Sequence, residues 1–217
     1  MQLTNFQLDA LREIGNIGNG HVSTCLSQLA NEKIIPIIPE IKLVPANKFN
    51  ELIEDSEGLT IGISSGLLGE VMGKVVMIFP YENGLSMLNE TIKERDPSLT
   101  TISESDESYL KKIGQLIIST YTHALSNFLD ILLVCYTANI VIYKGEDFLN
   151  WLTQELEISL KRQTPLPYSE IDSVLCYQST FNKSPFLRFW GSFFLLFDGQ
   201  TMKVIVKAID KLILKIK

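Results

Sequence analysis

The sequence of 217 residues has few cysteines and no hydrophobic run long enough to cross a bilayer. Its three cysteines, Cys25, Cys135 and Cys176, lie far apart without a C-x-x-C pair, which excludes a disulfide framework and a cysteine zinc site. The most apolar stretch, 186–197, contains Arg188 and is far shorter than the ~20 residues of a membrane-spanning helix. The N-terminus lacks a basic region followed by an apolar block, which is how a secretory signal begins. We therefore expect a cytoplasmic protein that does not insert into membranes.

Positive charge is also in short supply. Lysine and arginine together number 19 against 25 acidic residues, giving a formal net charge of −6. Nucleic-acid binding is disfavoured, because neutralising phosphates requires a dense field of basic side chains. Hydrophobic residues make up 46% of the chain, which is enough for a packed core. The length suits one large domain or two small intertwined halves.

Hydrophobic periodicity predicts two similar series of elements. The first begins with a helix over about 5–30, announced by a capping box at Thr4–Gln7. It continues with an extended segment over 33–45 that is interrupted by prolines. A hairpin of 59–64 with 70–79, joined near Gly66 and Gly69, and a helix over 82–95 follow. The second series begins with a cap at Ser103, which is followed by a predicted helix over 107–130 and strands over 131–138 and 140–143. It continues with a helix over 147–162, a hairpin of 171–181 with 186–197, and a final helix over 200–216.

The two series share sequence as well as order. Residues 11–27 align without gaps to 110–126, with five identities in seventeen positions. We predict an α+β fold of duplicated helix-plus-hairpin units related by a pseudo-twofold axis. A continuous β-sheet would carry the two leading helices on it. The chain would then be a single domain over 1–217, made of halves at about 1–100 and 101–217.

The first helix has a polar stripe. At about 100° per residue, Asp9, Glu13, Asn16 and Gly20 lie along one face, opposite the apolar residues. Gly15 lies toward the core side with Gly18, where a missing side chain allows close approach of another element. Gly20 lies on the polar side, where a bulky side chain would hold a partner away. The alternative is that Glu13 and Asn16 are ordinary solvent-facing residues.

The string D-x3-E-x2-N-x22-P, here Asp9, Glu13, Asn16 and Pro39, is set in LREIGNIGNGHVSTCLSQL. It resembles the motif of the CheC/CheX/FliY family of chemotaxis phosphatases, with CheC-type members most similar. The resemblance implies a phosphatase that hydrolyses the aspartyl-phosphate of a CheY-type response regulator. It also implies that Asn16 orients the attacking water, Glu13 pairs with a receiver lysine, and Asp9 and Gly20 support docking. Such an enzyme has no cofactor of its own, since the phosphoaspartate and a divalent metal belong to the receiver.

The second copy departs from this motif. Ser108 matches the leading position, but Lys112 replaces the glutamate, Gln115 replaces the asparagine and Ala138 replaces the proline. Lys112 would repel the receiver lysine, and Gln115 places its amide one methylene farther out. We expect this second site to be inactive.

Two non-enzymatic alternatives stay open. A chain with one degenerate site could bind CheD, the receptor-modifying deamidase, and act as an adaptor in receptor arrays. A flagellar-switch-associated scaffold is the other alternative, and the absence of an appended switch domain counts against it.

Overall fold

The computed structural model describes residues 3–37, 40–44, 58–71, 73–161, 173–184, 187–197 and 199–216. These residues form five helices and eight strands. The elements of the first half are α1 (Asn5–Ala30), β1 (Ile35–Pro36), β2 (Glu40–Val44), β3 (Leu59–Gly69), β4 (Gly73–Pro80) and α2 (Tyr81–Thr91). Those of the second half are α3 (Glu104–Leu129), β5 (Leu133–Cys135), β6 (Asn139–Lys144), α4 (Gly145–Lys161), β7 (Ser173–Ser184), β8 (Leu187–Phe197) and α5 (Gly199–Ile216).

All eight strands belong to one sheet in which every described pairing is antiparallel. Its central order is β7-β8-β4-β3; β1 and β2 pair with β7 at one edge, while β5 and β6 pair with β3 at the other. The hairpin of each half therefore pairs at its outer strand with the short strands of the other half. This order reads the same from both edges when the halves are exchanged. The α+β architecture with a continuous sheet is confirmed, and an origin by duplication stays a prediction.

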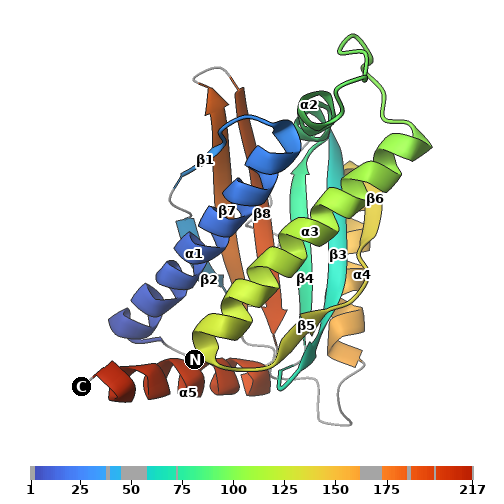
Figure 1. The fold of residues 1–217 in the computed structure, drawn as a ribbon. Helices are drawn as coiled ribbons and strands as arrows, with labels where there is room; N and C mark the ends of the chain where they lie inside the picture. Colours follow the sequence, from blue (N-terminus) through green and yellow to red (C-terminus); the bar gives the residue numbers. More distant parts are fainter. Residues whose placement is uncertain are drawn as a thin grey trace.

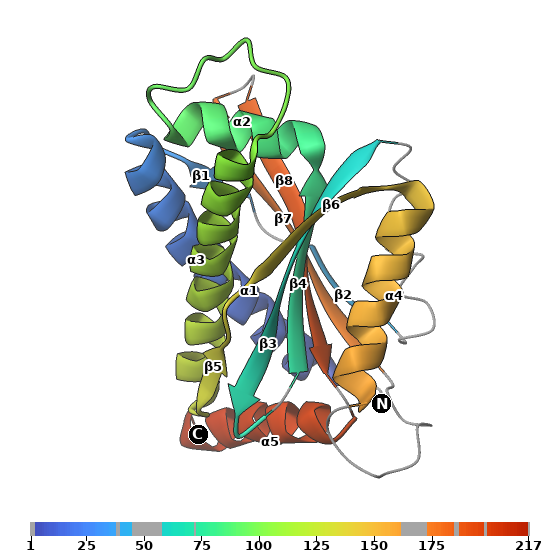
Figure 2. The same cartoon turned by 90° about the vertical axis from the view of Figure 1, so that its right-hand side faces the viewer.

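The helices cover the two faces of the sheet unequally. Figure 1 shows α1 and α3 side by side across one face, with α2 near one end of the molecule and α5 near the other. Figure 2 shows α4 alone against the opposite face. The larger core cluster lies under α1 and α3 and includes Leu11, Ile14, Ile118 and Ile63. None of the described helices is both long and apolar enough to cross a membrane.

The two long helices are bounded by the same local chemistry. The Thr4 side chain accepts from the backbone of Gln7, whose own side chain accepts from Thr4 N–H, so two donors at the start of α1 are satisfied. Ser103 and Asp106 form the same box at the start of α3. Each helix is 26 residues long and ends at a left-handed residue, which turns the chain back toward the sheet edge.

Gly18 sets how closely α1 approaches α3. A Cβ built at Gly18 would lie 2.6 Å from two ring atoms of Tyr121 on α3. The Tyr121 ring is itself stacked on Phe193 of β8, with 4.3 Å between the ring centroids, so it has little room to move. The expectation that Gly18 allows another element to come close is confirmed. Gly15 is buried on the same side of α1.

Several element boundaries differ from the prediction. Gly66 lies inside β3 and does not contribute to the turn, because it pairs with Lys74 of β4 and its carbonyl accepts from the Tyr136 N–H. The strand predicted over 131–138 is regular only in β5. Outside β5 the segment makes irregular hydrogen bonds to both backbone and side chains. Tyr136 N–H donates to the Gly66 carbonyl, Ile131 O accepts from the Ser126 hydroxyl, and Ala138 N–H donates to Gln115.

The helix contact predicts opposite effects for two glycine-to-alanine changes. Gly18→Ala forces its Cβ against the Tyr121 ring, and overpacking of this kind costs about 1–3 kcal/mol. Gly20→Ala meets nothing within 4 Å and gains helix propensity of about 1 kcal/mol. Denaturant unfolding should show a lower free energy of unfolding for Gly18→Ala and an unchanged or higher one for Gly20→Ala. Equal stability of the two variants would contradict the proposed role of Gly18.

Candidate functional site

The inner face of α1 is fastened at several points. Tyr177 of β7 is buried and donates its hydroxyl to the Leu11 carbonyl at 3.2 Å, and burial raises the pKa of this phenol. Near the start of α1, Gln7 Nε2 donates to Asp210 of α5 at 2.9 Å. Toward its end, Asn19 is 1% exposed and donates its Nδ2 to the Ile37 carbonyl at 3.1 Å. These contacts fix which side of α1 faces the solvent.

The polar stripe lies on that outer side. Asp9, Glu13, Asn16 and Gly20 are all exposed, and their spacing of three or four residues brings them together on one helix face. In the part of the chain that the structure describes, the side chains of Glu13 and Asn16 make no hydrogen bond or ion pair. Pro39, the last residue of the motif, lies outside the described residues.

Asp9 differs from its two neighbours because it has a partner. Its Oδ1 lies 2.7 Å from Arg12 Nη1, and the two side chains are 66% and 61% exposed. An ion pair this exposed contributes little to stability, so it can open at small cost when another molecule approaches.

The chemistry of this face is limited to binding and positioning. Glu13 supplies a negative charge and Asn16 supplies an amide that can accept and donate hydrogen bonds without titrating. No group of three or more His, Cys, Asp or Glu side chains that could hold a metal ion occurs among the described residues. A face of this kind can orient a water molecule or a charged group that a partner brings.

The matching face of α3 is arranged differently. Ser108 and Lys112 are exposed, but Gln115 is half-buried and its amide is engaged at both ends. Gln115 Nε2 donates to Cys135 Sγ at 3.3 Å, and Gln115 Oε1 accepts from the backbone N–H of Ala138. Burial raises the pKa of the Cys135 thiol, so the sulfur stays uncharged. The sequence comparison placed Gln115 correctly on α3 but missed these contacts with the segment that follows the helix.

One signal in the sequence could have revealed them. Ala138 stands where the motif has a proline, and alanine carries a backbone N–H that proline lacks. The sequence shows the departure from the motif at Ala138, and the structure adds the hydrogen bond that an alanine permits there.

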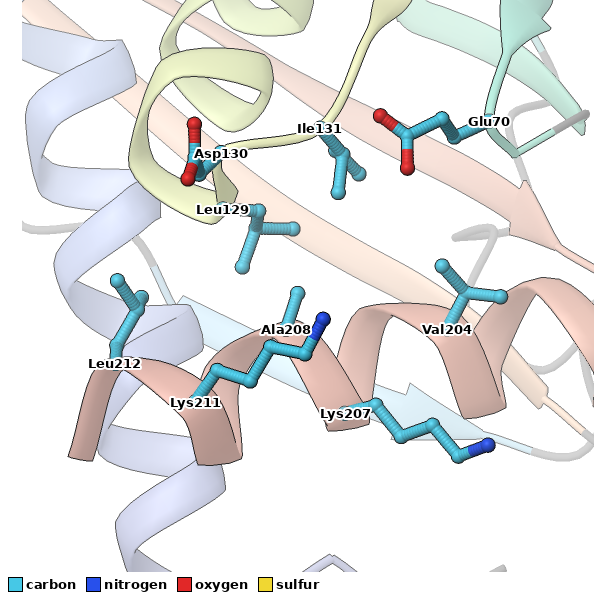
Figure 3. Close-up of a pocket in the computed structure, with 9 residues that line it drawn as sticks. All are labelled: Glu70, Leu129, Asp130, Ile131, Val204, Lys207, Ala208, Lys211 and Leu212. Atoms are coloured by element: carbon cyan, nitrogen blue, oxygen red, sulfur yellow. The ribbon is translucent and has the colours of Figure 1, made fainter. Parts of the chain in front are cut away.

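A cavity of about 180 Å³ lies elsewhere, between α5 and the turn from α3 to β5. Figure 3 shows Lys207 and Lys211 of α5 below Asp130 and Glu70, with apolar side chains between them. The Glu70 carboxylate accepts from the Leu132 N–H at 2.9 Å, so it already holds the turn. Asp9, Glu13 and Asn16 do not line this cavity, and all three lie exposed on the surface of α1.

Comparison with known proteins agrees with the motif. Residues 6–42, which contain all four motif positions, match the CheC-like family. The chain is also 31% identical over 126 residues to the CheY-P phosphatase CheC of Bacillus subtilis (strain 168). The resemblance to the CheC-like family is confirmed. The matched region spans 56% of this chain and 59% of that relative.

Solved structures extend the agreement in fold to nearly the whole chain. FliY of Thermotoga maritima superposes with a TM-score of 0.72 at 16% identity, covering 97% of this chain and 99% of that one. The FliM middle domain from H. pylori gives a TM-score of 0.60 at 10% identity, covering 95% and 99%. At these identities the likeness concerns the fold alone.

The two amides predict different costs for removal. Asn16→Ala removes an exposed side chain that has no partner among the residues the structure describes, so the free energy of unfolding should change by less than about 0.5 kcal/mol. Gln115→Ala leaves the buried Ala138 N–H without its acceptor, which costs about 1–3 kcal/mol. Chemical denaturation of both variants checks this difference. A destabilised Asn16→Ala together with a fully stable Gln115→Ala would refute it.

Proposed function

We propose that this protein is a phosphatase that hydrolyses the aspartyl-phosphate of a CheY-type response regulator through the outer face of α1. The observation that carries the proposal is the pair of exposed side chains Glu13 and Asn16, one turn apart on the helix, which have no hydrogen-bond or ion-pair partner among the described residues. The family match covers this helix, and the curated relative is named for CheY-P phosphatase activity.

The reaction needs little chemistry from this chain. A water molecule attacks the phosphorus, the bond from phosphorus to the aspartyl oxygen breaks, and aspartate and inorganic phosphate are formed. Transfer of a phosphoryl group depends mainly on in-line positioning and on neutralising charge. The receiver holds the phosphoaspartate and a divalent metal, so the phosphatase has to add only an oriented water.

Asn16 is suited to orient that water. Its amide oxygen can accept a hydrogen bond from the water and its amide N–H can donate one to it, so two hydrogen bonds fix the water in space. Both groups are available, because this side chain has no partner within the described ranges of the chain. Holding a reactant in the correct geometry is worth several orders of magnitude in rate.

Glu13 is suited to set the docking geometry. Its carboxylate lies one helical turn from Asn16, and we assign it to a lysine at the receiver's active site. The bond between these charges would form as α1 enters the receiver and water is displaced, which strengthens it. The site lies on an exposed helix face, as insertion into another protein requires.

We further propose that only the first half works in this way. Lys112 puts a positive charge where Glu13 has a negative one, and Gln115 is held by Cys135 and Ala138. Both changes oppose the docking and the water orientation assigned to α1.

The alternative proposal is an adaptor that binds CheD. It is supported by the degenerate second face, because a chain with one proposed phosphatase site could act mainly by binding. A protein of this kind would bind CheD or a receptor array tightly and would leave the lifetime of the phosphorylated receiver unchanged. Binding and dephosphorylation measured on the same sample separate the two functions.

The proposed mechanism predicts a loss of activity from one surface side chain. With phosphorylated receiver as substrate, Asn16→Ala should lower kcat on the order of 10²-fold, as when one positioned polar group is removed from an active site. Glu13→Ala should raise KM by weakening docking. Lys112→Ala on the matching face of α3 is the control and should retain full activity. Phosphate release is the measurement.

Two outcomes would contradict the mechanism. The first is no acceleration by the wild-type protein over the receiver's own rate of phosphate loss. The second is full activity of Asn16→Ala, because the amide would then have no part in orienting the water.

A further inference from the structure

The amide of Gln115 is held in a way that Asn16 is not. The two residues occupy matching positions, 99 residues apart, on helices of equal length. Gln115 Oε1 accepts from Ala138 N–H and Gln115 Nε2 donates to Cys135 Sγ at 3.3 Å. Asn16 has neither kind of contact in the part of the chain that is described. The difference therefore lies in the segment that follows each helix as much as in the helix itself.

We propose that the backbone N–H of Ala138, at the position where the motif has a proline, captures the Gln115 amide and thereby closes the second half as a phosphatase site. This inference rests on the proposed function. Ala138 would be a positioning residue that acts through Gln115. The role of the motif proline would be to provide no backbone N–H that could bond to the motif amide.

The environment of Ala138 makes the capture strong. Ala138 is fully buried, and an N–H buried without an acceptor carries a large desolvation penalty. Gln115 Oε1 is its only acceptor in the described structure, since this N–H takes no part in the ladder between β3 and β6. If Gln115 turned away to bind a water, the buried Ala138 N–H would lose its acceptor and the desolvation penalty would apply. A proline has no such N–H, so a proline at this position adds no desolvation penalty when the motif amide stays free.

The capture also explains why the longer side chain alone is an incomplete reason for inactivity. Glutamine keeps an amide with the same donors and acceptor as asparagine, and side chains of this length can orient an attacking water. What the structure removes is the availability of that amide. The charge of Lys112 is a separate obstacle, which can be reversed independently because this side chain is exposed.

The hydrogen bond itself can be tested without any activity measurement. Amide hydrogen exchange of the full chain should show Ala138 N–H protected in the wild type. In Gln115→Ala its protection should fall about fivefold or more, the factor that corresponds to one net hydrogen bond. Amides of β6 that bond to β3 serve as the internal control. Unchanged protection of Ala138 N–H in Gln115→Ala would overturn the inference.

The functional consequence is tested where the first site is silent. In the variant Asn16→Ala/Lys112→Glu, Gln115 is kept and the Ala138 N–H is removed in two ways. Ala138→Pro removes it with a ring, and lactic acid incorporated at position 138 removes it with no added bulk. Ala138→Gly is the matched control, because it changes the side chain and retains the N–H.

Loss of the N–H should raise the dephosphorylation rate above that of the receiver alone, whereas the glycine control should stay at the receiver's own rate. A merely structural role of Ala138 would produce no such gain. Absence of a gain with lactic acid, while the wild-type protein is active in the same assay, would overturn this inference alone. Inactivity of the wild-type protein would instead overturn the proposed function.

Discussion

The close approach of α1 to α3 at Gly18 is the constraint on which the rest of the site depends. With Tyr121 stacked between Gly18 and Phe193, the helix pair and the sheet form a single packed unit. The rotation of α1 about its own axis is then set by contacts on its inner side, where Tyr177 bonds to Leu11. Once that rotation is fixed, Glu13 and Asn16 have only the outward direction available. The inner side of α1 is packed and hydrogen-bonded, whereas Glu13 and Asn16 on its outer side have no partner among the described residues.

The sheet is completed only by strands from both halves. Each hairpin, β3–β4 or β7–β8, obtains its outer neighbours from the opposite half. The segment after α1 therefore pairs with β7, and the segment after α3 pairs with β3 and carries Ala138 toward Gln115. The contact of Ala138 with Gln115 shows that a residue of such a connecting segment can bond to the helix face beside it. Two faces built on one plan can in this way differ in function while the shared core stays the same.

Much of this could be predicted from the sequence because its strongest signals are local. Capping boxes and apolar periodicity located the long helices to within a few residues, and alternating patterns located both hairpins. The sheet order could not be derived, since the pairings of β2 with β7 and of β4 with β8 join residues more than a hundred positions apart. The extension of β3 through Gly66 was missed for a related reason. A glycine indicates a turn locally, and only its tertiary contacts, the pairing with Lys74 and the bond from Tyr136, show that it belongs to the sheet.

The candidate site shows the same division between local pattern and tertiary contact. Helical spacing alone places Asp9, Glu13 and Asn16 on one face. The structure adds that Glu13 and Asn16 have no hydrogen-bond or ion-pair partner in the described part of the chain. For α3 the spacing predicts an equivalent face, yet the fate of Gln115 is decided by a backbone donor twenty-three residues later. A motif that includes a distant proline thus specifies more than which side chains are present. In the proposed mechanism, the amide that orients the water has to be left without a partner of its own, and a proline at the distant position would offer it no backbone N–H.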